Sequence, residues 1–568
     1  MISRILRIAG AGLLAMAAVA QQKNAPATPV AEKWKISGVV VDAATNTPLA
    51  RVQVTITPAG KQNASRSMAV EGDGRFLFDN LDPGKYSLTA ERKGYLREGF
   101  DQHGQYSTSI AVGPKLKSED LLFRLHREAT ISGAVTDDQN EAVRRAEVML
   151  LEEATYNGRA ILRGRANTSD EGVYHFNHLS PGKYFVAVSS EPWYAQRPVP
   201  SPRTYLKTVV DSSVREITDQ QSPAANQEEN PPPEQPSSSP LDVAYPITFY
   251  PAATEFDSAT PIVLSSGDKF TADLNLRAVP ALHLRVTNPV PNQSTNITVE
   301  ARPVDQFTIG VHSTSMPLGG GVTEVNGLAP GNYILRVNSY DGKNWSSSSK
   351  EVSISADARV STDEKDVHIP VSGVVKLEPG ANLSGQTNIW LVDKASGTRH
   401  WGQVSAKNEF EIERGVPAGR YQVQVSTTGL FFKSLAATGG RVTGHTVEIG
   451  SGTAVKLTLV LSPGLAQVDG VALKDDSPAA GVLVLMIPED AAGNPQLFRL
   501  DQSDSDGTFT IASAVPGKYT VVAIENGWNL QWINPKVIKP YLAQGVPIQV
   551  EPKGKYEIKV KVQTTGSK

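Results

Sequence analysis

The chain has 568 residues, a formal net charge of −3 with a pI near 6.4, and no cysteine. Its Lys and Arg residues are scattered without a basic tract, which argues against nucleic acid as a partner, and the absence of cysteine excludes disulfides and lipid attachment to a cysteine. Charged residues make up only 20% of the chain, whereas 47 glycines and 38 prolines indicate many turns, as in an all-β protein.

The first twenty residues have the pattern of a secretory signal peptide. Arg4 and Arg7 precede an apolar stretch from Ile8 to Val19, which ends in small residues. This stretch is too short to span a bilayer as a helix, and no later segment is long and apolar enough to do so. We therefore predict a signal peptide at 1–20, a linker at 21–33, and export to the periplasm, the outer-membrane surface or the extracellular space.

A six-residue phrase recurs along the chain and defines an array of repeats. It reads Leu-Asp-Pro-Gly-Lys-Tyr at 81–86 and returns at 179–184 and 328–333, with looser forms that end at Tyr421 and Tyr519. Three of the four intervals between successive tyrosines are 98, 88 and 98 residues, which is the size of one β-sandwich, and the interval from Tyr184 to Tyr333 is 149 residues. We therefore predict five sandwich domains, at 34–127, 128–279, 280–370, 371–465 and 466–568.

The second domain is longer because it carries an insert at about 196–244. A run at 227–240 is rich in Pro, Glu, Gln and Ser and almost free of apolar residues. Such a segment has little to bury in a core, so we interpret the insert as a solvated, largely disordered loop.

Four of the five domains begin with a strand that contains a glycine at the same place, namely Gly38, Gly133, Gly373 and Gly470. A glycine inside a strand marks a bulge or a close approach of backbone, so we expect one structural cause for all four. The third domain departs from the pattern with Leu282-His283-Leu284-Arg285-Val286. Alternating apolar residues predict a closing strand in each domain, at 121–125, 274–276, 367–369, 457–461 and 558–562.

The repeated Pro-Gly pair is expected to turn the chain into a buried strand that begins at the tyrosine. We predict a type II turn, in which the glycine takes a positive φ angle near +80°. We also predict a tyrosine corner, in which the ring packs inward and the hydroxyl bonds back to nearby backbone. The residues concerned are Pro83, Gly84, Tyr86, Pro181, Gly182, Tyr184, Gly331, Tyr333, Gly419, Tyr421, Gly517 and Tyr519.

The combined motifs resemble the carboxypeptidase regulatory-like domain. They run from Ile36–Asp42 through Pro48–Val54 and Gly74-x-Phe76 to Pro83–Tyr86, and all domains except the degenerate third match well. The resemblance implies a transthyretin-like Greek-key sandwich, related in shape to collagen-adhesin B-type and starch-binding-like modules. The fold class is therefore predicted as all-β, a tandem array of about five Ig-like or transthyretin-like Greek-key β-sandwiches. The family carries no catalytic residues, so the resemblance implies no activity.

The sequence shows no arrangement typical of an enzyme. The close histidine pair His175 and His178 lacks the carboxylate pattern of a zinc site, and we favour solvent-facing or capping roles for both. The run Asp504–Gly507 resembles the start of a calcium loop, but the later ligands are missing, so we interpret it as a hairpin turn. We predict no enzymatic activity, no metal and no cofactor.

Aromatic residues follow the corner tyrosine by nine residues in three domains. We expect these rings at one pole of each sandwich, where a ring either stacks on a sugar or packs on the core or an adjoining domain. The candidates for ligand stacking are Tyr95, Trp193, Tyr194, Trp528 and Trp532.

The favoured hypothesis is an exported, non-catalytic scaffold or binding protein of the cell envelope. Its partner would be polysaccharide or an envelope protein, and several weak sites along one rod would act together. Two alternatives stay open: an accessory subunit of an outer-membrane transport or secretion assembly, and an exported hydrolase or peptidase whose site the sequence does not reveal.

Overall fold

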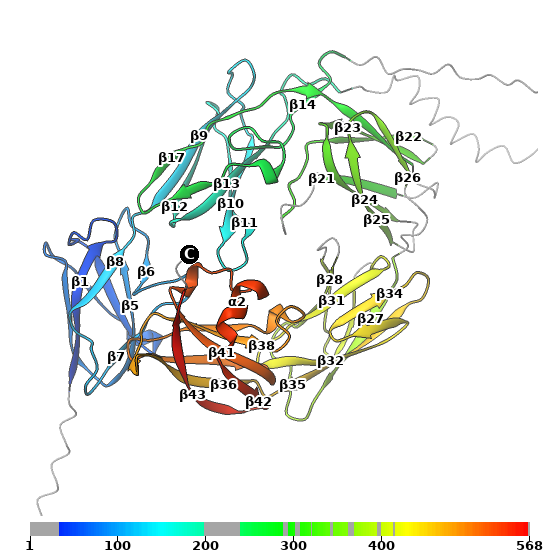
Figure 1. Cartoon of the computed structure of the whole chain (residues 1–568). Helices are drawn as coiled ribbons and strands as arrows, with labels where there is room; N and C mark the ends of the chain where they lie inside the picture. Colours follow the sequence, from blue (N-terminus) through cyan, green and yellow to red (C-terminus); the bar gives the residue numbers. More distant parts are fainter. Residues whose placement is uncertain are drawn as a thin grey trace, which may run out of the picture.

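The computed structural model describes residues 33–197, 239–287, 294–301, 307–319, 321–340, 345–361, 368–394, 399–412 and 415–565. The predicted signal peptide, residues 21–32 of the predicted linker and residues 198–238 of the predicted insert lie outside the described residues. Figure 1 shows five bodies of β-sheet that follow one another along the chain from blue to red. The predicted all-β fold of tandem sandwiches is confirmed.

The first two domains contain the following elements. The first has β1 (Trp34–Asp42), β2 (Gln53–Pro58), η1 (Gln62–Ala64), β3 (Arg66–Ala69), β4 (Arg75–Leu81), β5 (Gly84–Glu91), β6 (Glu98–Gly99), β7 (Ile110–Val112) and β8 (Leu121–Leu125). The second has β9 (Ala129–Thr136), β10 (Glu147–Ala154), β11 (Arg159–Asn167), β12 (Val173–Leu179), β13 (Gly182–Ser189), β14 (Val243–Ala244), β15 (Thr248–Phe249), η2 (Phe256–Ser258), β16 (Ile262–Leu264), β17 (Lys269–Thr271), β18 (Leu274–Asn275) and β19 (Val279–Pro280).

The third and fourth domains are built from strands alone in the described part of the chain. The third has β20 (Leu282–Thr287), β21 (Ser294–Ala301), β22 (Thr314–Gly319), β23 (Val322–Leu328), β24 (Gly331–Tyr340), β25 (Trp345–Ile354) and β26 (Ala358–Ser361). The fourth has β27 (Val371–Leu377), β28 (Asn388–Asp393), β29 (Arg399–Gln403), β30 (Glu409–Glu411), β31 (Gly419–Ser426), β32 (Leu430–Thr438), β33 (Gly440–Thr443), β34 (Thr446–Ile449) and β35 (Val455–Pro463).

The fifth domain adds a short α-helix to its sheets. Its elements are β36 (Ala466–Lys474), β37 (Ser477–Pro478), β38 (Leu483–Pro488), η3 (Pro495–Leu497), β39 (Arg499–Gln502), β40 (Thr508–Ala514), β41 (Gly517–Glu525), η4 (Gly527–Asn529), α2 (Pro535–Leu542), β42 (Val546–Val550) and β43 (Lys555–Thr564). Strand β43 pairs with both β36 and β41 and so joins the two sheets of this domain.

One strand arrangement recurs in every domain. The first strand pairs antiparallel with a strand from mid-domain and parallel with the closing strand, as β1 does with β4 and β8. The strand that begins at the corner lies in the opposite sheet, as β5 does beside β2. Apolar side chains of the two sheets meet between them and give each domain its own core cluster.

The repeated strand glycine makes room for an aromatic ring and for the closing strand. A Cβ atom at Gly38 would lie 2.2 Å from the carbonyl oxygen of Leu121 and 2.8 Å from the ring of Phe76. Both distances are far below van der Waals contact. The same pair of obstacles recurs at Gly373, with Leu457 and Phe410, and at Gly470, with Ile558 and Phe509.

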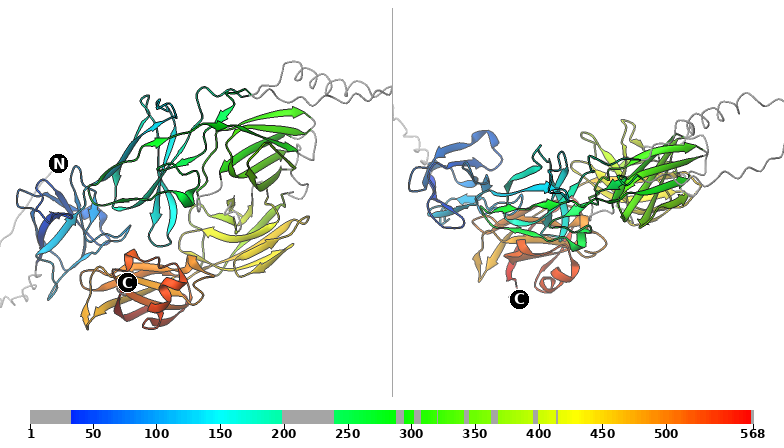
Figure 2. Two further views of the ribbon diagram at one scale, coloured as in Figure 1. Left: turned by 45° about the horizontal axis from the view of Figure 1, so that its top comes forward. Right: turned by 90° about the horizontal axis from the view of Figure 1, so that it is seen from above.

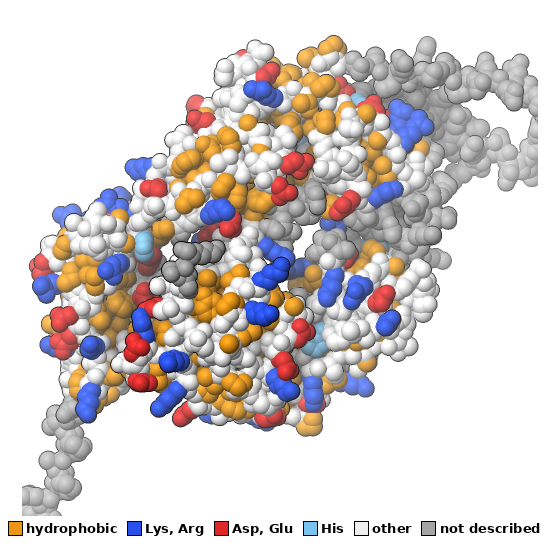
Figure 3. Space-filling model, viewed as in Figure 1, with side chains coloured by type: hydrophobic (Ala, Val, Ile, Leu, Met, Phe, Trp, Pro, Cys, Tyr) orange, Lys and Arg blue, Asp and Glu red, His pale blue; other side chains and the backbone are white. Residues whose placement is uncertain are grey.

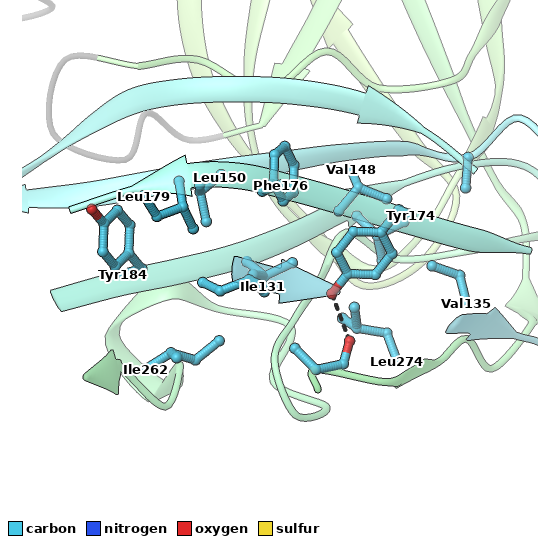
Figure 4. Packing of buried hydrophobic residues seen from close by; sticks show 14 of the residues in the cluster. Ile131, Val135, Val148, Leu150, Tyr174, Phe176, Leu179, Tyr184, Ile262 and Leu274 are labelled. Carbon is cyan, nitrogen blue, oxygen red and sulfur yellow. Dashed lines mark hydrogen bonds between the residues drawn. The ribbon is translucent and has the colours of Figure 1, made fainter. Parts of the chain in front are cut away.

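In the second domain the ring that covers the glycine is a tyrosine. The Tyr174 hydroxyl lies 3.1 Å from the position of a Cβ atom at Gly133 and donates to the carbonyl oxygen of Ala272 at 2.6 Å. Figure 4 shows this ring among the buried residues of the domain, with Ile131 and Leu274 close by. The cause expected for the repeated glycine is therefore a shared packing requirement.

The third domain solves the same packing problem with different residues. Leu284 takes the place of the glycine, opposite Val325 on one side and Ala358 on the other. Val325 stands where the other domains have an aromatic ring, which leaves room on that side for the larger side chain of Leu284.

The predicted closing strand of the third domain at 367–369 is wrong. The closing strand is β26, which pairs parallel with β20, whereas Ile369 is buried in the core of the fourth domain and bridges to Val416. Val367 lies outside the described residues. Apolar alternation continues from Ile369 into β27, so the pattern alone cannot separate the end of one domain from the start of the next.

The predicted type II turn at the Pro-Gly pair is also wrong. Gly84 and Gly517 have φ angles of 149° and 157°, and the other three corner glycines have no positive φ. The left-handed residue lies four positions earlier in every domain, at Asn80, His178, Gly327, Gly415 and Ser513. Pairing registers shift near this point in four domains, so a β-bulge begins the reversal and the Pro-Gly pair continues it in extended form.

The domains do not form the rod expected from a linear array. Figure 1 and Figure 2 show the fifth domain beside the first and second domains, so the chain closes on itself. Hydrogen bonds between residues about 400 positions apart join β39 and the turn after it to the first domain. The predicted rod does not form because domains that are not neighbours in sequence, the first and the fifth, contact each other.

The ends of the predicted insert are ordered and connect the second domain to the third. Arg197 Nη1 donates to the carbonyl oxygen of Val243 at 2.6 Å, and β14 pairs with β19. Asp242 accepts from the buried ring of His283 at 2.8 Å, and the other ring nitrogen lies 2.8 Å from Asn326. Residues 242–244, at the end of the predicted insert, therefore make contacts with the folded domains on either side.

Candidate functional site

The corner tyrosines are buried, and each hydroxyl finds its partner within the corner. In all five domains the hydroxyl donates to the backbone carbonyl four residues earlier. The pairs are Tyr86 with Asp82, Tyr184 with Ser180, Tyr333 with Ala329, Tyr421 with Pro417 and Tyr519 with Val515. Burial raises the pKa of Tyr184 and of Tyr333 to about 12, so both phenols stay protonated near neutral pH. These tyrosines stabilise separate corners and do not share a cleft.

Trp528 lies at the contact between the fifth and first domains. Its ring stacks on the imidazole of His103, with centroids 5.0 Å apart and planes inclined by 6°, and it also contacts Tyr106. Its Nε1 donates to the carbonyl oxygen of Gly481 at 3.2 Å. The ring is thus used in packing between domains.

Polar groups next to Trp528 fix the same contact. Gln502 is 2% exposed, and its Nε2 donates to the carbonyl oxygen of Asp101 at 2.6 Å and to the hydroxyl of Thr108 at 2.8 Å. Its Oε1 lies 3.1 Å from Nδ1 of His103. A buried amide whose donors and acceptor are satisfied across two domains fixes their relative orientation, because an unpaired group there would be costly.

The turn at Asp504–Gly507 docks on the edge of the first domain. Asp504 accepts the backbone N–H of Ser109 at 2.8 Å and pairs with Nζ of Lys85 at 2.5 Å. The Ser505 hydroxyl accepts the N–H of Ala111 in β7 at 2.8 Å. The geometry fits a hairpin turn, and the carboxylate that resembled a calcium ligand contacts the neighbouring domain. Within the described residues, no group of three or more His, Cys, Asp or Glu side chains could hold a metal ion.

Trp532 connects the fifth domain to the second. It is 9% exposed, and its ring centroid lies 5.6 Å from that of Tyr156 and 5.8 Å from that of Phe498. The N–H of Ile533 donates to the carbonyl oxygen of Tyr156 at 3.2 Å. Tyr156 lies in the loop between β10 and β11, so this hairpin of the second domain contacts the fifth.

Tyr95 lies at the joint between the first and second domains. Its hydroxyl donates to Oδ2 of Asp42 at 2.9 Å, and Nε of Arg127 donates to the same oxygen at 2.5 Å. Burial by itself would raise the pKa of the fully buried Asp42, but the Arg127 guanidinium and hydrogen bonds from Thr45 and Tyr95 hold it well below its usual range. The guanidinium groups of Arg92 and Arg127 lie 5.1 Å and 5.8 Å from the ring centroid.

Trp193 differs from the other aromatic candidates because its side chain is exposed. It is 82% exposed and meets Tyr194 edge-on, with centroids 5.8 Å apart and planes at 90°. Tyr194 is half-buried, and burial raises the pKa of its hydroxyl. The structure therefore separates the candidates: Trp528 and Trp532 lie in contacts between domains, Tyr95 packs against the core of its own domain, and Trp193 presents an indole face to solvent.

The histidine pair lies at the surface of the second domain. His178 is exposed and occupies the left-handed position of the bulge, with Nδ1 2.9 Å from Oε1 of Glu128. His175 is exposed on β12.

Among the described residues, no helix is both long enough and apolar enough to cross a membrane.

The contacts made by Gln502, His103 and Asp504 were missed by reasoning from the sequence. Their partners lie about 400 residues away, and no periodic or compositional signal connects the two segments. Gln502 and Thr108 can be recognised as partners only when the fifth domain lies against the first.

Comparison with known proteins gives one family and a set of remote structures. The family model of the carboxypeptidase regulatory-like domain matches residues 35–112, and no curated protein matches the sequence. A streptococcal ancillary pilin is 11% identical over 50% of this chain and 98% of its own, with a TM-score of 0.20. The minor pilin GBS52 of Streptococcus agalactiae is 11% identical over 35% and 98%, with a TM-score of 0.19. The major pilin subunit BcpA of Bacillus cereus is 10% identical over 76% and 99%, with a TM-score of 0.13.

At these identities and TM-scores the pilins carry no argument about what this chain does. The family match covers most of the first domain, including β1 through β7, and it agrees with the motifs read from the sequence. Residues 35–112 of the first domain are therefore similar to the carboxypeptidase regulatory-like domain, and the chain as a whole is a tandem array of β-sandwiches.

Proposed function

We propose that this chain is an exported, non-catalytic scaffold of the cell envelope that binds polysaccharide through Trp193. The observation that carries the proposal is the 82% exposure of this indole at a repeat position where Trp528 packs against the first domain and Tyr95 packs against the core of its own domain. Exposed aromatic faces bind the apolar faces of sugar rings, and a flat indole presents a large one. Tyr194 meets the indole edge-on and forms the side of the same surface.

The scaffold part of the proposal is supported by the contacts of the fifth domain. Two indoles and a buried amide of this domain contact the first and second domains, so the array has fixed internal geometry. A closed array holds its surface sites at constant distances, which favours simultaneous binding to a repetitive partner.

Binding is tested with the chain from residue 21 to residue 568 on a panel of neutral and charged polysaccharides. We expect retention on at least one polysaccharide and its loss in Trp193→Ala. Trp401→Ala is the matched control, because Trp401 is also exposed, at 42%, but lies in the fourth domain. Equal retention by the wild type and the Trp193→Ala variant, or no retention on any polysaccharide, contradicts the proposal.

Export is tested separately by expressing the full chain and fractionating the cells. We expect a processed form outside the cytoplasm whose N-terminus lies near Gln21. Recovery of the unprocessed chain in the cytoplasm alone would contradict this part of the proposal.

A further inference from the structure

A groove of about 510 Å³ lies where the first domain meets the second, and its rim is basic. This volume falls within the range of about 300–1,000 Å³ that small-molecule sites occupy. The lining residues that matter for the argument are Arg51, Gln53, Arg92, Lys93, Tyr95 and Arg97. The chain as a whole carries a net charge of −3, so this concentration of cations is local. Over the face drawn in Figure 3, Lys and Arg side chains are interspersed with Asp and Glu.

The carboxylates that line the groove are already engaged. Glu91 lies 3.6 Å from Nε of Arg97, and Glu128 lies 2.9 Å from Nδ1 of His178. Among the described residues, Arg51, Arg92 and Lys93 form no ion pair. Three positive charges therefore line the groove without a carboxylate partner among the described residues.

Arg92 is held in place by the aromatic ring below it. Its guanidinium lies 5.1 Å from the centroid of Tyr95, within the range of a cation–π interaction. Tyr95 is anchored in turn by its hydrogen bond to the fully buried carboxylate of Asp42. A cation that is ordered before binding loses less conformational entropy when a ligand arrives.

We infer that this groove binds an anionic polysaccharide that carries carboxylate groups along its chain. A guanidinium group matches a carboxylate with two parallel hydrogen bonds, and Lys93 adds a point charge beside it. The amide of Gln53 offers both a donor and an acceptor to sugar hydroxyls. Nucleic acid fits less well, because the chain has no basic tract that could follow a phosphate backbone beyond the groove.

This inference rests on the proposed function, since it names a class of polysaccharide, but it concerns a different surface from Trp193. The cations of the groove belong to the first domain and Trp193 belongs to the second, and the two sites bind through different interactions. Binding to the groove depends on charge and weakens with salt, whereas stacking on an indole depends little on ionic strength.

Polygalacturonate is the probe that tests the groove, with neutral dextran for comparison and calorimetric titration as the measurement. The variant is Arg51→Gln, Arg92→Gln and Lys93→Gln together. The matched control is Lys115→Gln, Lys117→Gln and Arg124→Gln, which removes the same charge from the first domain outside the groove. All six side chains lie at the surface, and unchanged thermal midpoints verify folding.

We expect the groove variant to bind polygalacturonate at least about tenfold more weakly, with a smaller salt dependence, and the control to change by less than about twofold. Equal losses in both variants, or none in either, would overturn the inference. So would tighter binding of duplex DNA that the groove variant abolishes. If dextran binds through Trp193 while polygalacturonate does not bind, the inference fails and the proposed function stands; if no polysaccharide binds at all, both fail.

Discussion

Trp193 and Trp528 occupy the same place in the repeat, nine residues beyond the corner tyrosine, yet they meet different surroundings. Trp193 is 82% exposed, whereas Trp528 stacks on His103 with 5.0 Å between ring centroids. The repeat delivers an aromatic side chain to one pole of the sandwich in both domains. Whether that ring binds a ligand or a neighbouring domain depends on which domain lies opposite, and this is a property of the whole array.

Tyr95 is the third aromatic residue at this repeat position, and it is partly buried. Its hydroxyl is buried against Asp42 at a joint between consecutive domains, while its ring supports Arg92 at the edge of a groove. One repeat position has therefore become a joint between neighbours in sequence, a contact between distant domains, and an exposed surface. Substitutions at and near these positions test that division.

The largest effect is expected for Trp532→Ala, which removes a buried ring that both packs inside the fifth domain and contacts the second. Truncation of a buried tryptophan costs about 3–5 kcal/mol, because it leaves a cavity. Hydrogen exchange of the β38 and β41 amides measures the loss of stability in the fifth domain. Exchange at β1 of the first domain is the internal control and should stay unchanged.

A smaller but pH-dependent effect is expected for Asp42→Asn at the joint that holds Tyr95. The folded state lowers the pKa of Asp42, so the carboxylate stabilises the first domain above the unfolded pKa of about 4, and this stabilisation is lost as the pH falls through the folded value. Loss of the charge at neutral pH removes about 2–3 kcal/mol, as expected for hydrogen bonds to a charged group. Hydrogen exchange of β1 at several pH values measures it.

The control for this substitution is Asp79→Asn, since Asp79 is an exposed residue that pairs with Arg66 at 3.6 Å. It should change the stability of the first domain by less than about 0.5 kcal/mol. If Asp42→Asn and the wild type lose stability equally between pH 4 and pH 2, the carboxylate is not the group that anchors this joint.

The sequence predicts contacts between residues that lie close together along the chain, but it does not predict contacts between residues that lie far apart along it. The corner tyrosine bonds to a carbonyl four residues away, so a recurring hexapeptide was enough to predict the corner, even though the left-handed residue proved to lie earlier, as at Asn80. The repeated glycine likewise indicated a packing constraint, although its ring partner Phe76 is about 40 residues away.

Two kinds of information were not available from the sequence pattern. The first is the boundary between domains that abut without a linker, because the alternation at Ile369 fits either domain. The second is the contact of Gln502 with Thr108, which depends on how five folded bodies pack and leaves no periodic trace in the chain. The exposure of Trp193 follows from the same packing, so it also had to be observed.

A moderate effect is expected for Trp528→Ala, which tests whether the array stays closed. The stacked contact with His103 and the hydrogen bond to Gly481 are lost, at a cost of about 1–2 kcal/mol, while Gln502 and Asp504 keep their own bonds to the first domain. Combined with Asp504→Ala, the substitution should open the contact. Small-angle X-ray scattering then shows a larger radius of gyration for the double variant.

The smallest effect on stability is expected for Trp193→Ala. Its comparison with Trp528→Ala contrasts the removal of an exposed indole with the removal of a packed one. An indole that is 82% exposed contributes little burial, so its removal should change unfolding of the second domain by less than about 0.5 kcal/mol. Exchange at β13 and β10 measures this, with β12 of the same domain as reference. A loss of more than about 2 kcal/mol would mean that Trp193 is packed in solution, and it could then no longer offer a free face to a sugar. A near-neutral result leaves the ring available, because a side chain that stabilises nothing in its own domain gives up no internal contact when it meets a ligand.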